Sequence, residues 1–273
     1  LERIKKQGKS GFYQGKTADL LVAEMQRGGG LISHEDLRSY QSVWREPIRG
    51  TYRGHEIVSM PPPSSGGVLL VQMLNMLEAH DLAAMGYGSA QAIHTIIEAE
   101  RRAYADRAQH LGDMDFYPVP IAQLTDKKYA KARFADFDSA KAGRSEEIEA
   151  GQLPPESMET THASVMDAKG NAVAYTTTLN LSYGSKIVVA GAGFLLNNEM
   201  DDFSVKENVA NYYGVIGREA NSIEAGKRML SSMTPTIVVK DGEPMLVTGS
   251  PGGSTIITTT MQVILNVIDH QMS

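Results

Sequence analysis

One threonine in this sequence has surroundings that could support nucleophilic chemistry. Residues 135–157 are polar and lack periodicity, which predicts a long exposed loop. The loop leads to Glu159, and Thr160 then opens a β-rich run. A threonine hydroxyl is a poor nucleophile at neutral pH, but cleavage after Glu159 would give Thr160 a free α-amino group with a reference pKa of about 7.7–8.0. Thr160 could then supply both the nucleophile and the general base.

The same position also has an ordinary structural interpretation. Two threonines before a strand are common, because threonine favours extended backbone. The boundary alone therefore leaves both interpretations open.

Helical patterns dominate the chain before Thr160. Apolar residues recur at helical spacing, and glycines or capping residues mark the ends. We predict helices over 16–27, from Ser33, over 68–79 and over 89–111, with a strand over 52–60. Charges are spread around the helix over 89–111, so we expect them to lie on a solvated face.

The glycine-rich segment before the helix over 68–79 allows two interpretations. Ser64, Ser65, Gly66 and Gly67 lie where a loop enters a helix N-terminus, which suits an anion. The same residues could serve only a tight, closely packed turn.

Strand patterns dominate after Thr160. We predict strands over 161–166 and 172–178 joined by a hairpin turn, further strands over 193–197, 236–240 and 245–249, and a helix over 255–268. Helices first, then a mostly antiparallel sheet, then a helix, favour layered α/β packing.

Composition narrows the classes of function. The net charge is −6 and the 26 Lys and Arg residues are scattered, so the chain lacks the basic stripe of a nucleic-acid-binding protein. The absence of cysteine excludes thiol catalysis and disulfides within it. No apolar run in the sequence approaches the length of a membrane span, and His34, His55, His94 and His110 lack the spacing of metal ligands. The sequence begins at Leu1 rather than methionine, and we expect it to be a piece of a longer protein.

Several long motifs occur in one order along the chain. They are Phe12 to Gly15, Ser59 to Gly67, Tyr104 to Arg107, Thr160 to Val165, Gly170 to Ala174, Thr178 to Asn180, Leu195 to Phe203, Leu230 to Thr236 and Gly249 to Ser254. In these motifs the sequence resembles the γ-glutamyltranspeptidases, over essentially all 273 residues.

The resemblance implies an α+β fold, a four-layer αββα sandwich of the N-terminal-nucleophile hydrolase type that is incomplete in this chain. Residues 1–159 would be the C-terminal part of the large-subunit region and residues 160–273 the N-terminal part of the small, catalytic subunit. Self-cleavage between Glu159 and Thr160 would produce a heterodimer of the two.

The resemblance also implies roles for individual residues. Thr160 would be the nucleophile and Thr178 the hydroxyl that orients it. The backbone N–H groups of Gly252 and Gly253 would form the oxyanion hole, where glycine lets the main chain approach the tetrahedral carbon.

The donor's head group would be held by a second set of residues. Asn180, Glu199 and Asp202 would bind its α-ammonium, since charge-assisted hydrogen bonds are strong, and Ser231 and Ser232 its α-carboxylate. Tyr213 resembles a tyrosine of a lid loop, although Glu207 and Ala210 replace prolines found in relatives.

The implied reaction is γ-glutamyl transfer or hydrolysis through a γ-glutamyl-threonine intermediate. The donors would be glutathione and related γ-glutamyl compounds, the acceptors amino acids, peptides or water, with no cofactor and no catalytic metal. Alternatives are a related acylase, an enzyme that cleaves poly-γ-glutamate, or a non-catalytic truncated homologue. Resemblance to bacterial members implies a periplasmic or secreted location.

Overall fold

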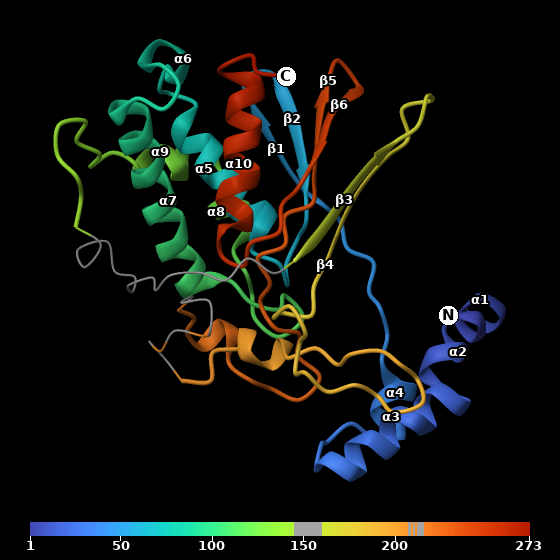
Figure 1. Ribbon diagram of the computed structural model, residues 1–273. Coiled ribbons are helices and arrows are strands. Elements are labelled where there is room, and N and C mark those ends of the chain that lie inside the picture. Colours follow the sequence, from blue (N-terminus) through green and yellow to red (C-terminus); the bar gives the residue numbers. More distant parts are fainter. Residues whose placement is uncertain (145–159, 207–208, 210, 212–215) are drawn as a thin grey trace. The chain divides into compact units, whose positions relative to one another are not determined.

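The computed structural model describes residues 1–144, 160–206, 209, 211 and 216–273 (Figure 1). The chain divides into two compact units. The first comprises residues 1–45 and 181–198, and the second residues 46–180 and 199–273. Each unit contains residues from both sides of Thr160.

The first unit is built around one amphipathic helix. It contains α1 (Glu2–Gln7), α2 (Ser10–Tyr13), α3 (Gly15–Gly28) and α4 (His34–Ser39). As predicted, α3 ends at a left-handed glycine, Gly29, and Ser33 caps α4 through a reciprocal capping box with Asp36. Its core consists of Ala18, Leu21, Val22, Met25, Leu37 and Val189.

The strand predicted over 193–197 is wrong. The segment makes an isolated bridge between Val188 and Leu195, with main-chain hydrogen bonds to residues 185–189 beside it. Its apolar residues Phe194 and Leu196 pack against the helical core instead. Their alternation reflects this packing rather than a sheet.

The second unit contains a four-stranded antiparallel sheet in the order β1-β2-β5-β6. The strands are β1 (Ile48–Tyr52), β2 (His55–Ser59), β5 (Thr236–Lys240) and β6 (Glu243–Thr248). The predicted strand over 52–60 therefore misses β1 and the turn at Arg53 and Gly54, both with positive φ. Gly50 weakens the strand pattern of β1 in the sequence. The structure requires glycine there, because a Cβ would lie 2.6 Å from a methyl carbon of Val71.

Helices cover one face of this sheet (Figure 1). The three long ones are α5 (Gly66–Leu77), α7 (Ala90–His110) and α10 (Thr255–Ile268), all close to the predicted bounds. The short ones are α6 (Leu82–Met85), α8 (Ile121–Leu124) and α9 (Lys127–Arg133). Every residue of α5 is buried, and this helix forms the centre of the core.

Most of the charges of α7 are not solvated, contrary to the sequence-based expectation. Glu98, Arg102, Asp106 and Arg107 are all buried. Arg102 bridges Glu98 and Asp136 at 2.7 and 2.8 Å, and Asp106 accepts hydrogen bonds from Gln72 and Tyr129. Paired charges allow a charged helix to enter the interior, because each partner compensates the desolvation of the other.

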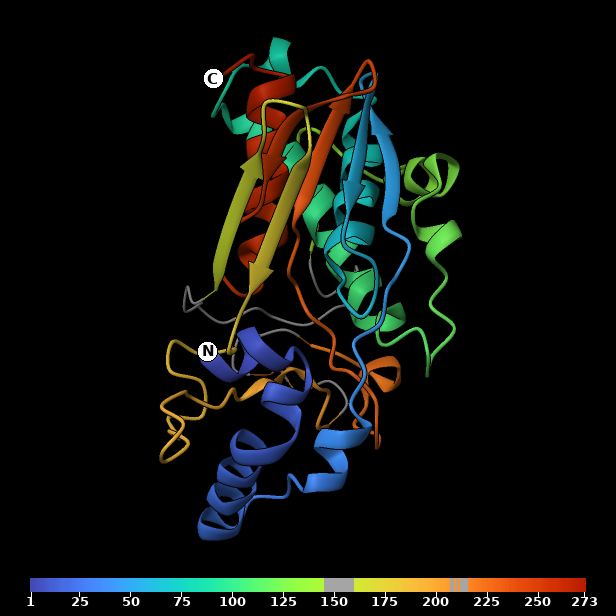
Figure 2. The same ribbon diagram turned by 90° about the vertical axis from the view of Figure 1, so that its right-hand side faces the viewer.

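A separate hairpin lies on the other side of the sheet, against β5 and β6 (Figures 1 and 2). It consists of β3 (Thr161–Met166) and β4 (Ala172–Thr177), joined by a turn in which Asp167 accepts main-chain hydrogen bonds from Lys169 and Asn171. The described part of this unit thus has a helical layer, a sheet and a hairpin, which confirms a mixed helix and sheet fold. Among the described residues, no helix is long and apolar enough to cross a membrane.

Candidate active site

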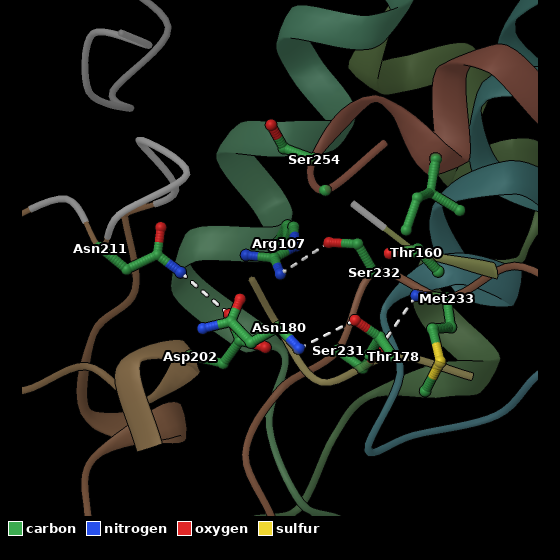
Figure 3. Close-up of a pocket in the computed structure, with 12 residues that line it drawn as sticks. Arg107, Thr160, Thr178, Asn180, Asp202, Asn211, Ser231, Ser232, Met233 and Ser254 are labelled. Carbon is green, nitrogen blue, oxygen red and sulfur yellow. Dashed lines mark hydrogen bonds between the residues drawn. The ribbon is translucent and has the colours of Figure 1, made fainter. Parts of the chain in front are cut away.

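Most of the residues predicted for the site line one small pocket in the second unit (Figure 3). The pocket has a volume of about 30 Å³. From the predicted set it brings together Thr160, Thr178, Asn180, Asp202, Ser231, Ser232 and Gly253. It also contains residues that the sequence did not indicate: Arg107, Asn211, Met233, Ser254 and Ile256.

The hairpin register places the two threonines expected to be catalytic beside each other. Thr161 lies opposite Thr177 in the antiparallel pair, so Thr160 and Thr178 are the next facing positions. The chain then turns at Asn180, which has a φ of 71°. Its main-chain N–H donates to the Thr178 hydroxyl at 2.9 Å. The ends of β3 and β4 therefore carry both hydroxyl groups into the pocket.

The acidic pair lies, partly buried, on a short 3-10 turn, η2 (Glu199–Asp202). Glu199 and Asp202 share a side-chain hydrogen bond, and burial raises the pKa of both. For Asp202, burial and the neighbouring Glu199 charge raise the pKa to about 8, while Arg107 acts in the opposite direction. Because two partly buried carboxylates at close range repel each other, a cation between them would be favoured.

Asn211 contacts the same carboxylate. Its side-chain amide donates to Asp202 at 3.2 Å (Figure 3). The Asp202 carboxylate thus accepts a hydrogen bond from Asn211 in this structure, as it would from a bound ammonium group.

The serine pair lies in a loop held by the glycine-rich segment before α5. The Ser231 N–H donates to the Pro63 carbonyl at 2.8 Å, and the Ser65 N–H donates to the Ser231 carbonyl at 2.9 Å. A Cβ on Gly66 would lie 2.4 Å from the Met233 carbonyl oxygen. The structure therefore supports the close-packing interpretation of these glycines, since Gly66 packs against the serine loop and Gly67 against the Met60 carbonyl.

Arg107 is a member of the pocket that sequence reasoning missed. Its guanidinium is buried and donates to the hydroxyls of Ser65 at 2.9 Å and Ser232 at 3.2 Å. Burial lowers its pKa, and the charges of Tyr104 and Asp202 raise it. The signal available in the sequence was the motif Tyr104 to Arg107, but its charge suggested a solvated helix.

The proposed oxyanion loop precedes α10. Gly252 and Gly253 have φ values of 130° and 55°, which only glycine adopts readily. A Cβ on Gly252 would also lie 2.6 Å from the Thr255 hydroxyl, which donates to the Gly252 carbonyl. From α7, the Tyr104 hydroxyl donates to the Ser254 carbonyl. This loop is thus fixed from both sides.

Four predicted residues are not among those that line the pocket. Glu199 is outside the pocket lining but contacts Asp202, and Gly252 adjoins the lining residue Gly253. Glu159 and Tyr213 lie outside the described residues. Within the described part of the chain, no cluster of three or more His, Asp or Glu residues could hold a metal ion.

The family model described as gamma-glutamyltranspeptidase matches residues 1–273. The glutathione hydrolase proenzyme of Escherichia coli strain K12 is 54% identical over 274 residues, which cover 100% of this chain and 47% of that protein. This chain therefore belongs to the γ-glutamyltranspeptidase family, and it spans about half the length of that curated relative.

Two solved structures are similar to this one. The crystal structure of Helicobacter pylori γ-glutamyltranspeptidase matches with a TM-score of 0.53 and 48% identity, over 54% of this chain and 42% of that chain. Cephalosporin acylase from Bacillus halodurans matches with a TM-score of 0.80 and 25% identity, over 99% of this chain and 46% of that chain. The fold of this chain is thus that of the γ-glutamyltranspeptidase and acylase structures.

Proposed function

We propose that the full-length protein containing this chain is a γ-glutamyltransferase and glutathione hydrolase with an N-terminal threonine nucleophile. The observation that carries this proposal is the single pocket in which Thr160 and Thr178 meet both Asp202 and the serine pair. This supports the proposal, because two threonine hydroxyls lie beside groups suited to both charges of an amino-acid head group. Glutathione and other γ-glutamyl compounds are the donors, and water, amino acids or peptides are the acceptors.

The reaction is acyl transfer in two halves. After chain cleavage the free α-amine of Thr160 accepts the hydroxyl proton while the hydroxyl oxygen attacks the γ-carbonyl carbon. Backbone N–H groups of Gly252 and Gly253 stabilise the resulting oxyanion. The ammonium formed on Thr160 then protonates the leaving amine, and an ester between the γ-glutamyl group and Thr160 remains. Water or an acceptor amine repeats the sequence on this ester and releases the product.

Recognition of the donor follows from charge. Glu199, Asp202 and Asn180 bind the α-ammonium, and Ser231 and Ser232 bind the α-carboxylate. The raised pKa values of the acidic pair support the first role, since an ammonium group would relieve the repulsion that raises them. The buried guanidinium of Arg107 supports carboxylate binding by the serine pair, because it is positively charged and donates a hydrogen bond to the Ser232 hydroxyl.

Maturation, assembly and location belong to the same proposal. Cleavage between Glu159 and Thr160 separates a large and a small subunit that remain together as a heterodimer. The intact fold is a four-layer αββα sandwich, which the exposed apolar side chains Val165, Val173 and Tyr175 on the hairpin support. Further chain would cover them. The family resemblance supports a periplasmic or secreted location.

A donor-selectivity experiment tests this function. The full-length protein is assayed with γ-glutamyl-p-nitroanilide and with glutaryl-p-nitroanilide, which lacks the α-amino group. We expect kcat/KM to be at least ~10-fold higher for the γ-glutamyl donor, because a charged hydrogen bond contributes about 1.5–3 kcal/mol. A preference for the glutaryl donor would instead indicate an acylase, and no turnover of either would favour a non-catalytic homologue.

A further inference from the structure

We propose that Asn221 is a positioning residue that sets the spacing between the two halves of the donor-binding pocket. One half is the acidic turn with Asp202, and the other is the loop with Ser231 and Ser232. This inference rests on the proposed function, because it assigns a role to the spacing between the ammonium-binding and carboxylate-binding groups.

The Asn221 side chain joins these two halves directly. Its amide nitrogen donates to the Asp202 carbonyl oxygen at 2.7 Å, and its amide oxygen accepts from the Leu230 N–H at 2.9 Å. Leu230 immediately precedes Ser231. Asn221 is only 3% exposed, so water does not compete well for either bond. One buried side chain therefore bridges the main chain of both recognition segments.

The main chain of Asn221 is itself held in place. It lies at the end of the 3-10 turn η3 (Glu219–Asn221), and its carbonyl accepts from the Ser204 N–H at 2.9 Å. A Cβ on Gly112 would lie 2.0 Å from the Ala220 carbonyl oxygen, so η3 packs directly on the chain after α7. The bridge is thus anchored to the core rather than to a free loop.

The serine loop has a second anchor in the same place. The Arg228 N–H donates to the buried Asp113 carboxylate at 2.9 Å. Asp113 follows Gly112, so the segment that packs against η3 also holds the start of the serine loop. Between Arg228 and the bond to Asn221 only Met229 intervenes, and the loop has little freedom to move away from Asp202.

The chemistry of this position calls for an asparagine. A single side chain must donate at one end and accept at the other, which a short primary amide does. Aspartate would keep the acceptor for Leu230 but lose the donor to Asp202, and would add a negative charge beside the acidic pair. Alanine would remove both bonds and leave the Asp202 carbonyl and the Leu230 N–H without this partner.

The effect of losing the Asn221 bridge on kcat/KM should depend on which groups the donor substrate carries. The α-ammonium and α-carboxylate of a γ-glutamyl group sit on one carbon, so both can be bound well only if the two halves of the pocket keep a fixed separation. A donor that carries only one of these groups can follow whichever half binds it. Loss of the bridge should therefore cost most for the complete head group.

The experiment uses the full-length enzyme with three p-nitroanilide donors. These are γ-glutamyl, glutaryl, which lacks the ammonium, and 4-aminobutyryl, which lacks the carboxylate. Asn221→Ala is compared with Asn75→Ala, a matched control because Asn75 is also buried and donates to one main-chain carbonyl, that of Thr125, away from the pocket. We expect Asn221→Ala to lower kcat/KM by at least ~10-fold for the γ-glutamyl donor and by less than ~3-fold for the two truncated donors.

The control separates positioning from stability. Asn75→Ala should change kcat/KM for all three donors by one common factor, since only the amount of folded enzyme changes. If Asn221→Ala does not fold, Asn221→Asp takes its place in the experiment. This variant should lower the ratio of kcat/KM for the γ-glutamyl donor to that for the glutaryl donor. Melting temperatures of all variants establish which are folded at the assay temperature.

Two contrary outcomes have different meanings. If the wild type prefers the γ-glutamyl donor and the Asn221 variants lose activity equally with all donors, Asn221 is merely structural and this inference is overturned. If the wild type itself prefers the glutaryl donor, the proposed function fails, and the inference that rests on it fails as well.

Discussion

The main-chain N–H of Asn180 donates to the hydroxyl oxygen of Thr178 across 2.9 Å. This bond fixes the orientation of the hydroxyl, which accepts from the main chain and can donate its own proton to a neighbouring oxygen. The hairpin register places Thr160 at the facing position. The turn after β4 therefore orients the hydroxyl group that is expected to orient the nucleophile.

This relationship leads to a prediction for Thr178. In the full-length enzyme, Thr178→Val keeps the shape of the side chain but removes the hydroxyl, and we expect kcat to fall by at least ~10-fold with a smaller change in KM. Thr178→Ser retains the hydroxyl and should keep more of the rate. Steady-state kinetics with a γ-glutamyl donor measures both, and a Thr178→Val enzyme with wild-type kcat would remove the residue from the mechanism.

Asp202 should contribute to donor binding through its charge. Asp202→Ala in the full-length enzyme is expected to lower kcat/KM for γ-glutamyl donors by at least ~10-fold, since a charged hydrogen bond contributes about 1.5–3 kcal/mol. The loss should be small for a glutaryl donor, which has no ammonium to bind. An unchanged kcat/KM for the γ-glutamyl donor would show that Asp202 lies outside the binding site.

The raised pKa of Asp202 predicts proton release when donor binds. Without ligand its pKa is about 8, so at pH 7 the acidic pair still holds a proton. A bound ammonium favours the ionised form, and on the order of one proton should leave per site at pH 7 and almost none near pH 10. Calorimetric titration of L-glutamate into the enzyme in buffers of different ionisation enthalpy measures this number, which should vanish in Asp202→Asn.

The same shift makes the unliganded fold less stable as pH rises. The native state keeps the Asp202 proton up to about pH 8, whereas the unfolded chain releases it near the ordinary aspartate value of 3.8. Stability from this group is therefore complete below the unfolded pKa and is lost as pH rises to about 8. Asp202→Asn should raise the melting temperature more at pH 8 than at pH 5. An equal change at both values would contradict the raised pKa.

Arg107 should matter through geometry as well as charge. Its planar guanidinium reaches Ser65 and Ser232 together, and the compact ammonium of lysine cannot reproduce this fork. We expect Arg107→Lys to raise KM for γ-glutamyl donors by at least ~10-fold with a smaller effect on kcat. Arg101→Lys on the same helix is the control, because Arg101 donates to Glu98 and to the Gly143 carbonyl rather than to the pocket, and the change should leave KM unaltered. A KM unaffected in both variants would argue against a role for Arg107 in carboxylate binding.

The regular elements were predictable because their signals are local. The helix over 255–268 and the hairpin around 167–171 follow from apolar spacing and turn residues, and the structure has them at those positions. The failures have tertiary causes. Glycine at position 50 lowers the strand propensity of β1. Its presence is explained by the close packing of the Val71 side chain, a contact that no local sequence pattern reveals.

The site was predictable only in part for the same reason. The motifs containing Thr160, Asp202 and Ser231 could be related to a known family, and the structure brings them together in one pocket. The burial of Arg107 could not be foreseen, since a charged residue on a helix is usually solvated and its partners lie far away in sequence. Asn221 carries no signal of its own, because its role depends on two distant main-chain groups.

The last prediction concerns Thr160, which in the proposed mechanism performs both chain cleavage and catalysis. In the uncut chain its nitrogen is part of the peptide bond with Glu159, so only the hydroxyl is available as a nucleophile. Attack on the Glu159 carbonyl would shift the acyl group from nitrogen to oxygen, and hydrolysis of that ester would release the α-amine. Thr160→Ala should therefore leave the full-length protein as one uncut, inactive chain.

Two neighbouring variants sharpen this test. Thr160→Ser keeps the hydroxyl and should cleave and turn over, though more slowly, because the β-methyl group that restricts χ1 is lost. Thr161→Ala removes the adjacent hydroxyl, which lies on the exposed start of β3, and should retain both activities. Intact-mass spectrometry and N-terminal sequencing would show the cleavage, with the new chain beginning Thr160-Thr161-His162. Two chains from Thr160→Ala, or labelling of Thr161 by a γ-glutamyl mechanism-based inhibitor, would refute the assignment of Thr160 and with it the proposed mechanism.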